Sequence, residues 1–197
     1  MRVLATHLPH TVRRDVEIVQ LKGGSSYSEL ATNDFEVMRA FCEAFNARAC
    51  YLPLPVIFQD VRTLRIVERD PHIADILERG RRTDMVIFTV GSVARESLLL
   101  NLGHLSESDI ERLLAESVGD ACSRFFTARG AIAVPDIDER TAGIALDELA
   151  SRSIRVLVAG GQHKTAALST ALKMGLATHL VTDNRAARAL LAEESPR

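Results

Sequence analysis

A glycine pair followed by a lysine stands at the boundary between a predicted strand and a predicted helix. In the stretch IRVLVAGGQHKTAALSTALKMG, residues 154–175, Gly160 and Gly161 follow an aliphatic run, and Lys164 falls in the first turn of the helix. A helix N-terminus presents unpaired N–H groups and the positive end of the helix dipole, so a cation there is unfavourable unless an anion lies nearby. Glycines let an anion approach the backbone closely. The stretch predicts a site for phosphate or carboxylate, although a plain strand-to-helix turn with a solvated lysine would give the same pattern.

Small or polar residues also follow other predicted strands. Ligands of open parallel sheets bind outside the carboxyl ends of the strands, so such residues are expected to meet at one edge. Each alone could be simple turn chemistry, but together they favour an anionic ligand. They are Gly23 and Gly24, Gly91 and Ser92, and Thr182 and Asp183.

Predicted strands and helices alternate almost throughout the chain, which is typical of an α/β protein with a mostly parallel sheet. Pro71 interrupts the helical stretch 60–82, which could be one or two short helices. Ser106 with Asp109 predicts a variant capping box, and Gly175 a helix C-terminus. Residues 118–146 show the least helical pattern and could hold irregular strands. The other predicted strands are 16–21, 48–52, 84–92, 154–159 and 178–183, and the other predicted helices 34–46, 105–116, 164–174 and 184–194.

The composition limits the possible functions. A chain of 197 residues with 47% hydrophobic residues is expected to form one domain, residues 1–197. Its formal charge of −2 provides no basic field for nucleic acid. The three cysteines form no CxxC pair, which favours a reducing compartment and a cytoplasmic protein. We see no targeting segment or membrane span, and no metal-ligand spacing around the histidines. We therefore expect neither a metal nor a cofactor.

A series of motifs resembles, in order and spacing, the effector-binding domain of the SorC family of bacterial transcriptional regulators. The resemblance covers nearly the whole chain, and its last two motifs together are fairly specific. It implies a Rossmann-like three-layer sandwich with the NagB/RpiA-like fold of sugar-phosphate isomerases and glucosamine-6-phosphate deaminase. It also implies a sensor that binds a phosphorylated sugar and contacts DNA only through a separate helix-turn-helix domain, which this chain lacks. The motifs are VEIVQLKGG, YLPLP, DMVIFTVGS, LGHLSESDIERL, VGDACSRFF, RTAGIALDEL, VAGGQHKTAALSTALKMG and LVTDNRAARALL.

The resemblance also implies site residues at matching positions. The phosphate contact falls on Lys164 and on the turn of Gly160 and Gly161. Asp120 and Arg140 match polar positions near the ligand, although either could instead be a structural ion-pair partner. The pocket after a central strand and the loop facing the sugar are matched by Gly91 and Ser92, and by Gly23 and Gly24.

The chain departs from the family pattern at its start. The family has a further strand and a glycine-threonine phosphate loop before the helix matched by RVLATHLP, whereas this chain begins within that helix. A missing central strand would leave unpaired backbone edges and exposed apolar surface, which a second copy could cover. We therefore expect a homo-oligomer, a dimer or a tetramer.

Two other functions remain open. The same fold supports sugar-phosphate isomerases and deaminases, whose chemistry needs a carboxylate or histidine as general base. Asp60, Asp120 and His163 are candidates, but no stretch shows a cluster of such groups, and we expect a protein without enzymatic activity. The third alternative is a dimerisation module that has lost its ligand.

Overall fold

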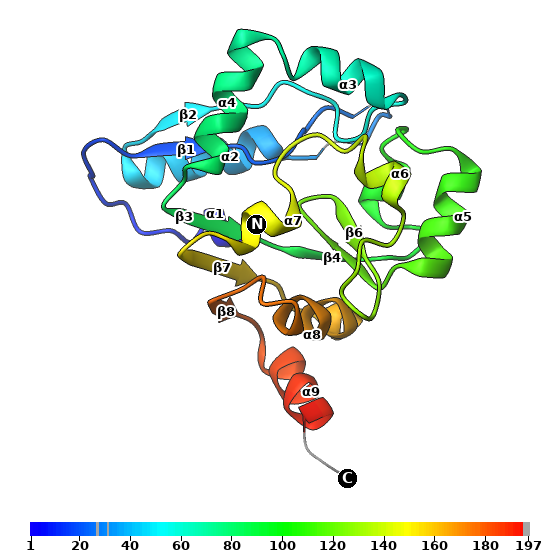
Figure 1. The fold of residues 1–197 in the computed structure, drawn as a ribbon. Coiled ribbons are helices and arrows are strands. Elements are labelled where there is room, and N and C mark those ends of the chain that lie inside the picture. The colour runs from blue at the N-terminus through cyan, green and yellow to red at the C-terminus, as the bar shows by residue number, and fades with distance from the viewer. Residues whose placement is uncertain (27, 31, 195–197) are drawn as a thin grey trace.

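The computed structural model describes residues 1–26, 28–30 and 32–194 (Figure 1). Parallel strands lie at its centre. Strand β1 (Glu17–Val19) pairs with β2 (Arg48–Cys50), and β7 (Ile154–Val158) pairs with β3 (Met85–Phe88) on one side and β8 (His179–Val181) on the other. The prediction of an α/β fold with parallel strands is confirmed.

The stretch 84–92, predicted as one strand, forms two strands instead. After β3 the chain leaves the parallel sheet at Thr89, and β4 (Val90–Ser92) joins an antiparallel sheet with β5 (Gly119–Ala121) and β6 (Arg124–Phe126). Val86, Phe88 and Val90 are all buried. The alternation of buried and partly exposed side chains thus continues across the break. Only the partner strand changes, and the periodicity of the sequence cannot show this change.

Strands β5 and β6 are joined by a tight two-residue turn. Cys122 and Ser123 have φ values of 51° and 67°, the left-handed conformation that a type I′ hairpin turn requires at both central positions. The expected irregular strands at 118–146 are therefore a regular hairpin followed by two short helices, α6 (Pro135–Asp138) and α7 (Leu146–Ala150).

Several predicted helix boundaries are confirmed. The stretch 60–82 divides into α3 (Val61–Val67) and α4 (Pro71–Arg81), and the carboxylate of Asp70 accepts hydrogen bonds from the first N–H groups of α4. Ser106 and Asp109 form a capping box at the start of α5 (Glu107–Glu116). The remaining helical elements are α1 (Arg2–Ala5), α2 (Asp34–Phe45), α8 (Thr165–Lys173) and α9 (Asn184–Glu194), with short 3-10 turns η1 (Leu98–Asn101) and η2 (Gln162–Lys164).

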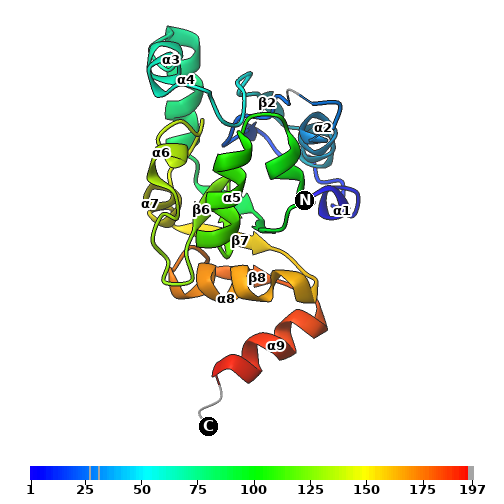
Figure 2. The same ribbon diagram turned by 90° about the vertical axis from the view of Figure 1, so that its right-hand side faces the viewer.

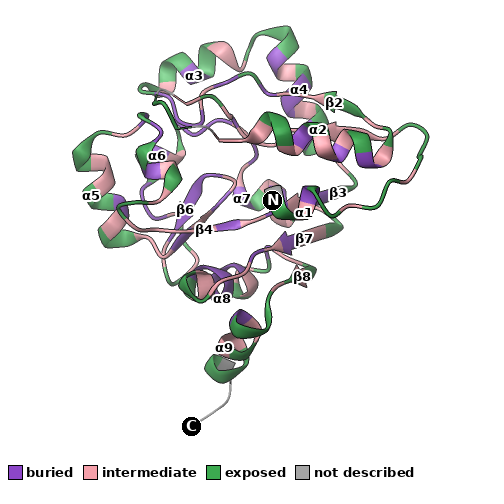
Figure 3. Ribbon diagram, turned by 180° about the vertical axis from the view of Figure 1, so that it is seen from behind, coloured by how far each residue is buried: buried purple, intermediate pink, exposed green. Residues whose placement is uncertain are grey.

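Three groups of buried apolar residues hold these elements together (Figure 3). The largest lies between the strands and α8 and includes Phe126, Leu157 and Leu168. Helix α9 is different, because it extends away from the body in two perpendicular views (Figures 1 and 2). In the part of the chain that the structure describes, no helix combines the length and the apolar character that crossing a membrane requires.

Each of the three sheets has strands with an open edge. Among the described residues, β1 pairs with β2 alone and β3 with β7 alone. Met85 of β3 and Val181 of β8 are 47% and 51% exposed. Open edges and exposed apolar side chains favour association, but the expected homo-oligomer remains a prediction.

Candidate functional site

The centre of the candidate site is a carboxylate facing a glycine on the neighbouring strand. Asp120 of β5 lies opposite Gly91 of β4, and its Oδ2 accepts a hydrogen bond of 3.1 Å from the backbone N–H of Ser123. Its Oδ1 would lie 2.1 Å from a Cβ on residue 91, so only glycine leaves room for this carboxylate. Ser92, next to Gly91, faces Gly119 in the same sheet.

The environment of Asp120 favours the protonated form of its carboxyl group. Burial raises the pKa of Asp120 to about 6, although the Ser123 N–H and the positive charges of Lys22 and Lys164 act to lower that pKa. Lys22 follows strand β1, and Lys164 stands at the start of α8. Two cations that follow different strands therefore act electrostatically on one carboxylate.

Lys22 belongs to a polar cluster after strand β1. Its ammonium lies 3.3 Å from Oδ2 of Asp34 and donates a hydrogen bond of 3.2 Å to the carbonyl of Gly23. Gln20 Nε2 donates to the same carboxylate oxygen, at 3.3 Å. A Cβ on Gly24 would stand 2.5 Å from that oxygen, so the glycine admits the carboxylate.

Gly23 has a simpler structural role. A Cβ at this position would lie 2.1 Å from the carbonyl oxygen of Pro55, so any side chain would collide with that backbone segment. A contact of Gly23 and Gly24 with the ligand remains a prediction. Close packing on protein atoms accounts for both glycines.

The glycine turn before α8 has the geometry that an anion site needs. Gly161 has a φ of 97°, which favours glycine, and the following residues form η2 up to Lys164, the N-cap of α8. The N–H of Gly161 donates a hydrogen bond of 2.5 Å to Oδ2 of Asp183, the residue before α9. A side chain on Gly160 would meet the same carboxylate oxygen at 2.5 Å. One protein anion therefore already lies at the turn.

Arg140, by contrast, forms a buried ion pair. Its Nη2 lies 2.7 Å from Oδ2 of Asp109, and its Nη1 donates to the carbonyl of Phe58 at 2.8 Å. Burial acts to raise the pKa of Asp109, but hydrogen bonds from Ser106 and Arg140 bring that pKa below its usual value. Both arms of the guanidinium group are thus engaged within the protein. A contact between Arg140 and the ligand remains a prediction.

The sequence analysis missed Lys22, Asp34 and Gln20. Lys22 carried a signal, since it stands directly between a predicted strand and Gly23 in VEIVQLKGG. Asp34 carried none, because an acidic residue in the first turn of a helix is ordinarily explained by the helix dipole. Its contact with Lys22 depends on how α2 packs beside β1.

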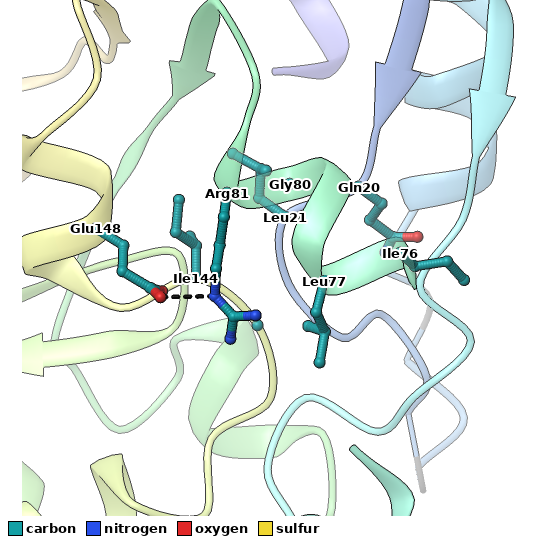
Figure 4. Close-up of a pocket in the computed structure, with 9 residues that line it drawn as sticks. Gln20, Leu21, Ile76, Leu77, Gly80, Arg81, Ile144 and Glu148 are labelled. Carbon is teal, nitrogen blue, oxygen red and sulfur yellow. Dashed lines mark hydrogen bonds and ion pairs between the residues drawn. The ribbon is translucent and has the colours of Figure 1, made fainter. Parts of the chain in front are cut away.

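Two cavities of the fold lie elsewhere. A cavity of about 10 Å³ between α4 and the end of β1 holds at most a water molecule, and Arg81 and Glu148 form an ion pair of 2.7 Å at its edge (Figure 4). A wider groove of about 800 Å³ is lined by residues of α7, α8 and the loop after β6, including Met174 and Leu176. Among the described residues, no group of three or more histidine, cysteine or acidic side chains could hold a metal ion.

Comparison with known proteins gives a consistent result. The family described as "Putative sugar-binding domain" matches residues 1–192. The deoxyribonucleoside regulator of Bacillus subtilis is 43% identical over 178 residues, which is 90% of this chain and 57% of that protein. The erythritol catabolism regulatory protein EryD of Brucella abortus is 26% identical over 188 residues, 95% of this chain and 59% of that protein. The chain therefore spans less than two thirds of the length of these relatives.

Solved structures share the fold. A DeoR family transcriptional regulator from Listeria monocytogenes superposes with a TM-score of 0.84 at 30% identity, over 96% of this chain and 74% of that one. The full-length sorbitol operon regulator SorC from Klebsiella pneumoniae superposes with a TM-score of 0.86 at 22% identity, over 96% of this chain and 63% of that one. At that lower identity the second likeness concerns the fold alone.

Proposed function

Because the chain belongs to the sugar-binding domain family of transcriptional regulators, we propose that it senses a phosphorylated sugar and performs no chemistry on it. The observation that carries this proposal is the carboxylate of Asp120 opposite Gly91, on which the positive charges of Lys22 and Lys164 act. Lys164 and the turn of Gly160 and Gly161 bind the phosphate group, where a cation and backbone N–H groups suit an anion. Asp120 accepts a hydrogen bond from a sugar hydroxyl, and Gly91 and Ser92 line the pocket.

The wider role follows from the relatives, which are named as regulators. In the proposed arrangement the sugar phosphate changes the DNA binding of a separate helix-turn-helix domain, and the protein acts in the cytoplasm. The chain associates as a dimer or tetramer, with the open edges of β1 and β3 as candidate contact surfaces. Sedimentation of the chain at high micromolar concentration tests this association, and a monomer there would contradict it.

The sugar itself is best sought among small phosphorylated sugars. The relative that is 43% identical is named a deoxyribonucleoside regulator. Phosphorylated pentoses and deoxypentoses are therefore tested first, followed by hexose and triose phosphates. Each compound is paired with its unphosphorylated counterpart. A ligand that binds only the native state raises the melting temperature, by more the further its concentration exceeds the Kd.

The test compares the unchanged chain with Lys164→Ala and with Lys173→Ala, which removes a lysine at the far end of the same helix. We expect one phosphorylated sugar to raise the melting temperature of the unchanged chain and of Lys173→Ala, and to have no effect on Lys164→Ala. If no compound stabilises the folded chain, a module that only associates becomes the better explanation. If conversion of the sugar phosphate is detected, the isomerase or deaminase alternative replaces the proposal.

A further inference from the structure

Asp183 connects the proposed phosphate position with helix α9. Its Oδ2 accepts the hydrogen bond from the N–H of Gly161 at 2.5 Å. Its Oδ1 accepts hydrogen bonds from the N–H groups of Arg185 and Ala186, at 2.8 and 2.9 Å. One carboxylate therefore closes the glycine turn with one oxygen and caps α9 with the other.

The N–H group of Gly161 is one that a phosphate at this turn would use. It stands three residues before Lys164, and η2 lies between β4, which carries Gly91, and α9. Hydrogen bonds from the N–H groups of Ala186, Gly161 and Arg185 hold the pKa of Asp183 below its usual value. The carboxylate is thus an anion at neutral pH. A phosphate group and this carboxylate repel each other and compete for the same donor.

Helix α9 is anchored on one side only. Ala186 is fully buried and Leu190 packs partly against the largest apolar core, whereas Leu191 is 67% exposed. The helix extends away from the body beyond this point (Figures 2 and 3). A short helix with one anchored end is marginally stable in water, so its population depends on the hydrogen bonds at that end.

Resting on the proposed function, we propose that Asp183 is an internal competitor of the ligand's phosphate, and that phosphate binding takes over the N–H of Gly161 and loosens the start of α9. Phosphate binding at the site and firm capping of α9 then compete in one equilibrium. The bound state has a less firmly capped α9, and the unbound state has the carboxylate in the phosphate's place. Helix α9 is in this way the element that reports occupancy of the site.

The experiment measures the affinity for inorganic phosphate and the hydrogen exchange of residues 184–194. Asp183→Asn removes the negative charge but keeps a side-chain oxygen suited to helix capping. We expect this variant to bind phosphate at least threefold more tightly than the unchanged chain. Asp70→Asn is the matched control, because Asp70 caps α4 in the same way through His72 and Ile73. Its phosphate affinity should equal that of the unchanged chain.

Exchange supplies the second readout. Saturating phosphate should accelerate exchange in residues 184–194 of the unchanged chain at least threefold. Asp183→Ala, which removes all three hydrogen bonds to the carboxylate, should show this faster exchange without phosphate. If phosphate binds and depends on Lys164, but Asp183→Asn leaves the affinity unchanged or phosphate leaves the exchange of α9 unchanged, the inference is wrong and the proposed function stands. If neither phosphate nor any sugar phosphate binds the unchanged chain or Asp183→Asn, both are wrong.

Discussion

The carboxylate of Asp120 occupies the space that a side chain on Gly91 would need, with Oδ1 at 2.1 Å from the position of such a Cβ. The two residues are direct cross-strand partners in the β4–β5 pair. Glycine at position 91 therefore decides where the carboxylate of Asp120 can lie. The electrostatic character of the site depends on the absence of a side chain one strand away.

Gly91→Ala should displace this carboxylate. We expect a loss of sugar-phosphate affinity of at least tenfold and a loss of unfolding free energy of about 1–3 kcal/mol, the usual range for overpacking. Calorimetric titration and urea denaturation measure the two effects. Gly80→Ala is the matched control, because its new Cβ would meet the flexible side-chain end of Leu21 at 3.3 Å. Equal affinity in Gly91→Ala and the unchanged chain would refute the role of Asp120 in the site.

The raised pKa of Asp120 predicts a specific dependence of stability on pH. The unfolded chain loses this proton near pH 4, the usual range of an aspartate, whereas the folded chain keeps it to about 6. Between these values the folded state binds more protons, so its stability falls as pH rises and this contribution stays constant above about pH 7. Asp120→Asn should therefore be more stable than the unchanged chain at pH 8, by up to about 3 kcal/mol, and equally stable near pH 4. Urea denaturation across this range checks the difference, and a constant difference would contradict the assigned cause.

Lys22 should act on the same titration. Its ammonium lowers the pKa of Asp120, so Lys22→Met should move the midpoint of the pH-dependent stability difference above that of the unchanged chain. The unfolding free energy of each lysine variant is compared with that of the same variant carrying Asp120→Asn as well. Lys173→Met, at the other end of α8, should leave the midpoint where it is. An unchanged midpoint in Lys22→Met would separate Lys22 from the site.

Local signals predicted much of this fold. The break at Pro71 and the capping box of Ser106 with Asp109 depend on residues within one turn of each other, and both were predicted correctly. Glycines at strand ends were visible in the sequence, but only Gly161 is explained by its own backbone conformation. Gly91 and Gly160 are required by carboxylates from other elements. The α/β class followed from the alternation of such elements.

Long-range packing accounts for what the sequence did not reveal. The change of partner at Thr89 leaves no mark on side-chain alternation. The contact of Lys22 with Asp34 and that of Gly161 with Asp183 join elements whose relative positions only the folded chain determines. Arg140 with Asp109 illustrates the same limit, since a charged residue in a sequence pattern does not show whether its partner is a ligand or a protein group.

Two measurements, the free energy of unfolding and the sugar-phosphate affinity, distinguish a structural role of Arg140 from a contact with the ligand. Both side chains of its ion pair are largely buried, at 10% and 14% exposure, so Arg140→Met should leave the carboxylate of Asp109 buried without its cation. Removing one partner of such a pair typically costs about 3–5 kcal/mol of unfolding free energy. The double variant Arg140→Met with Asp109→Asn should recover part of this loss, because no unpaired charge then remains. If Arg140 is structural, sugar-phosphate affinity measured on folded protein should be the same in the double variant as in the unchanged chain. A tenfold weaker affinity in a fully folded double variant would instead place Arg140 at the ligand.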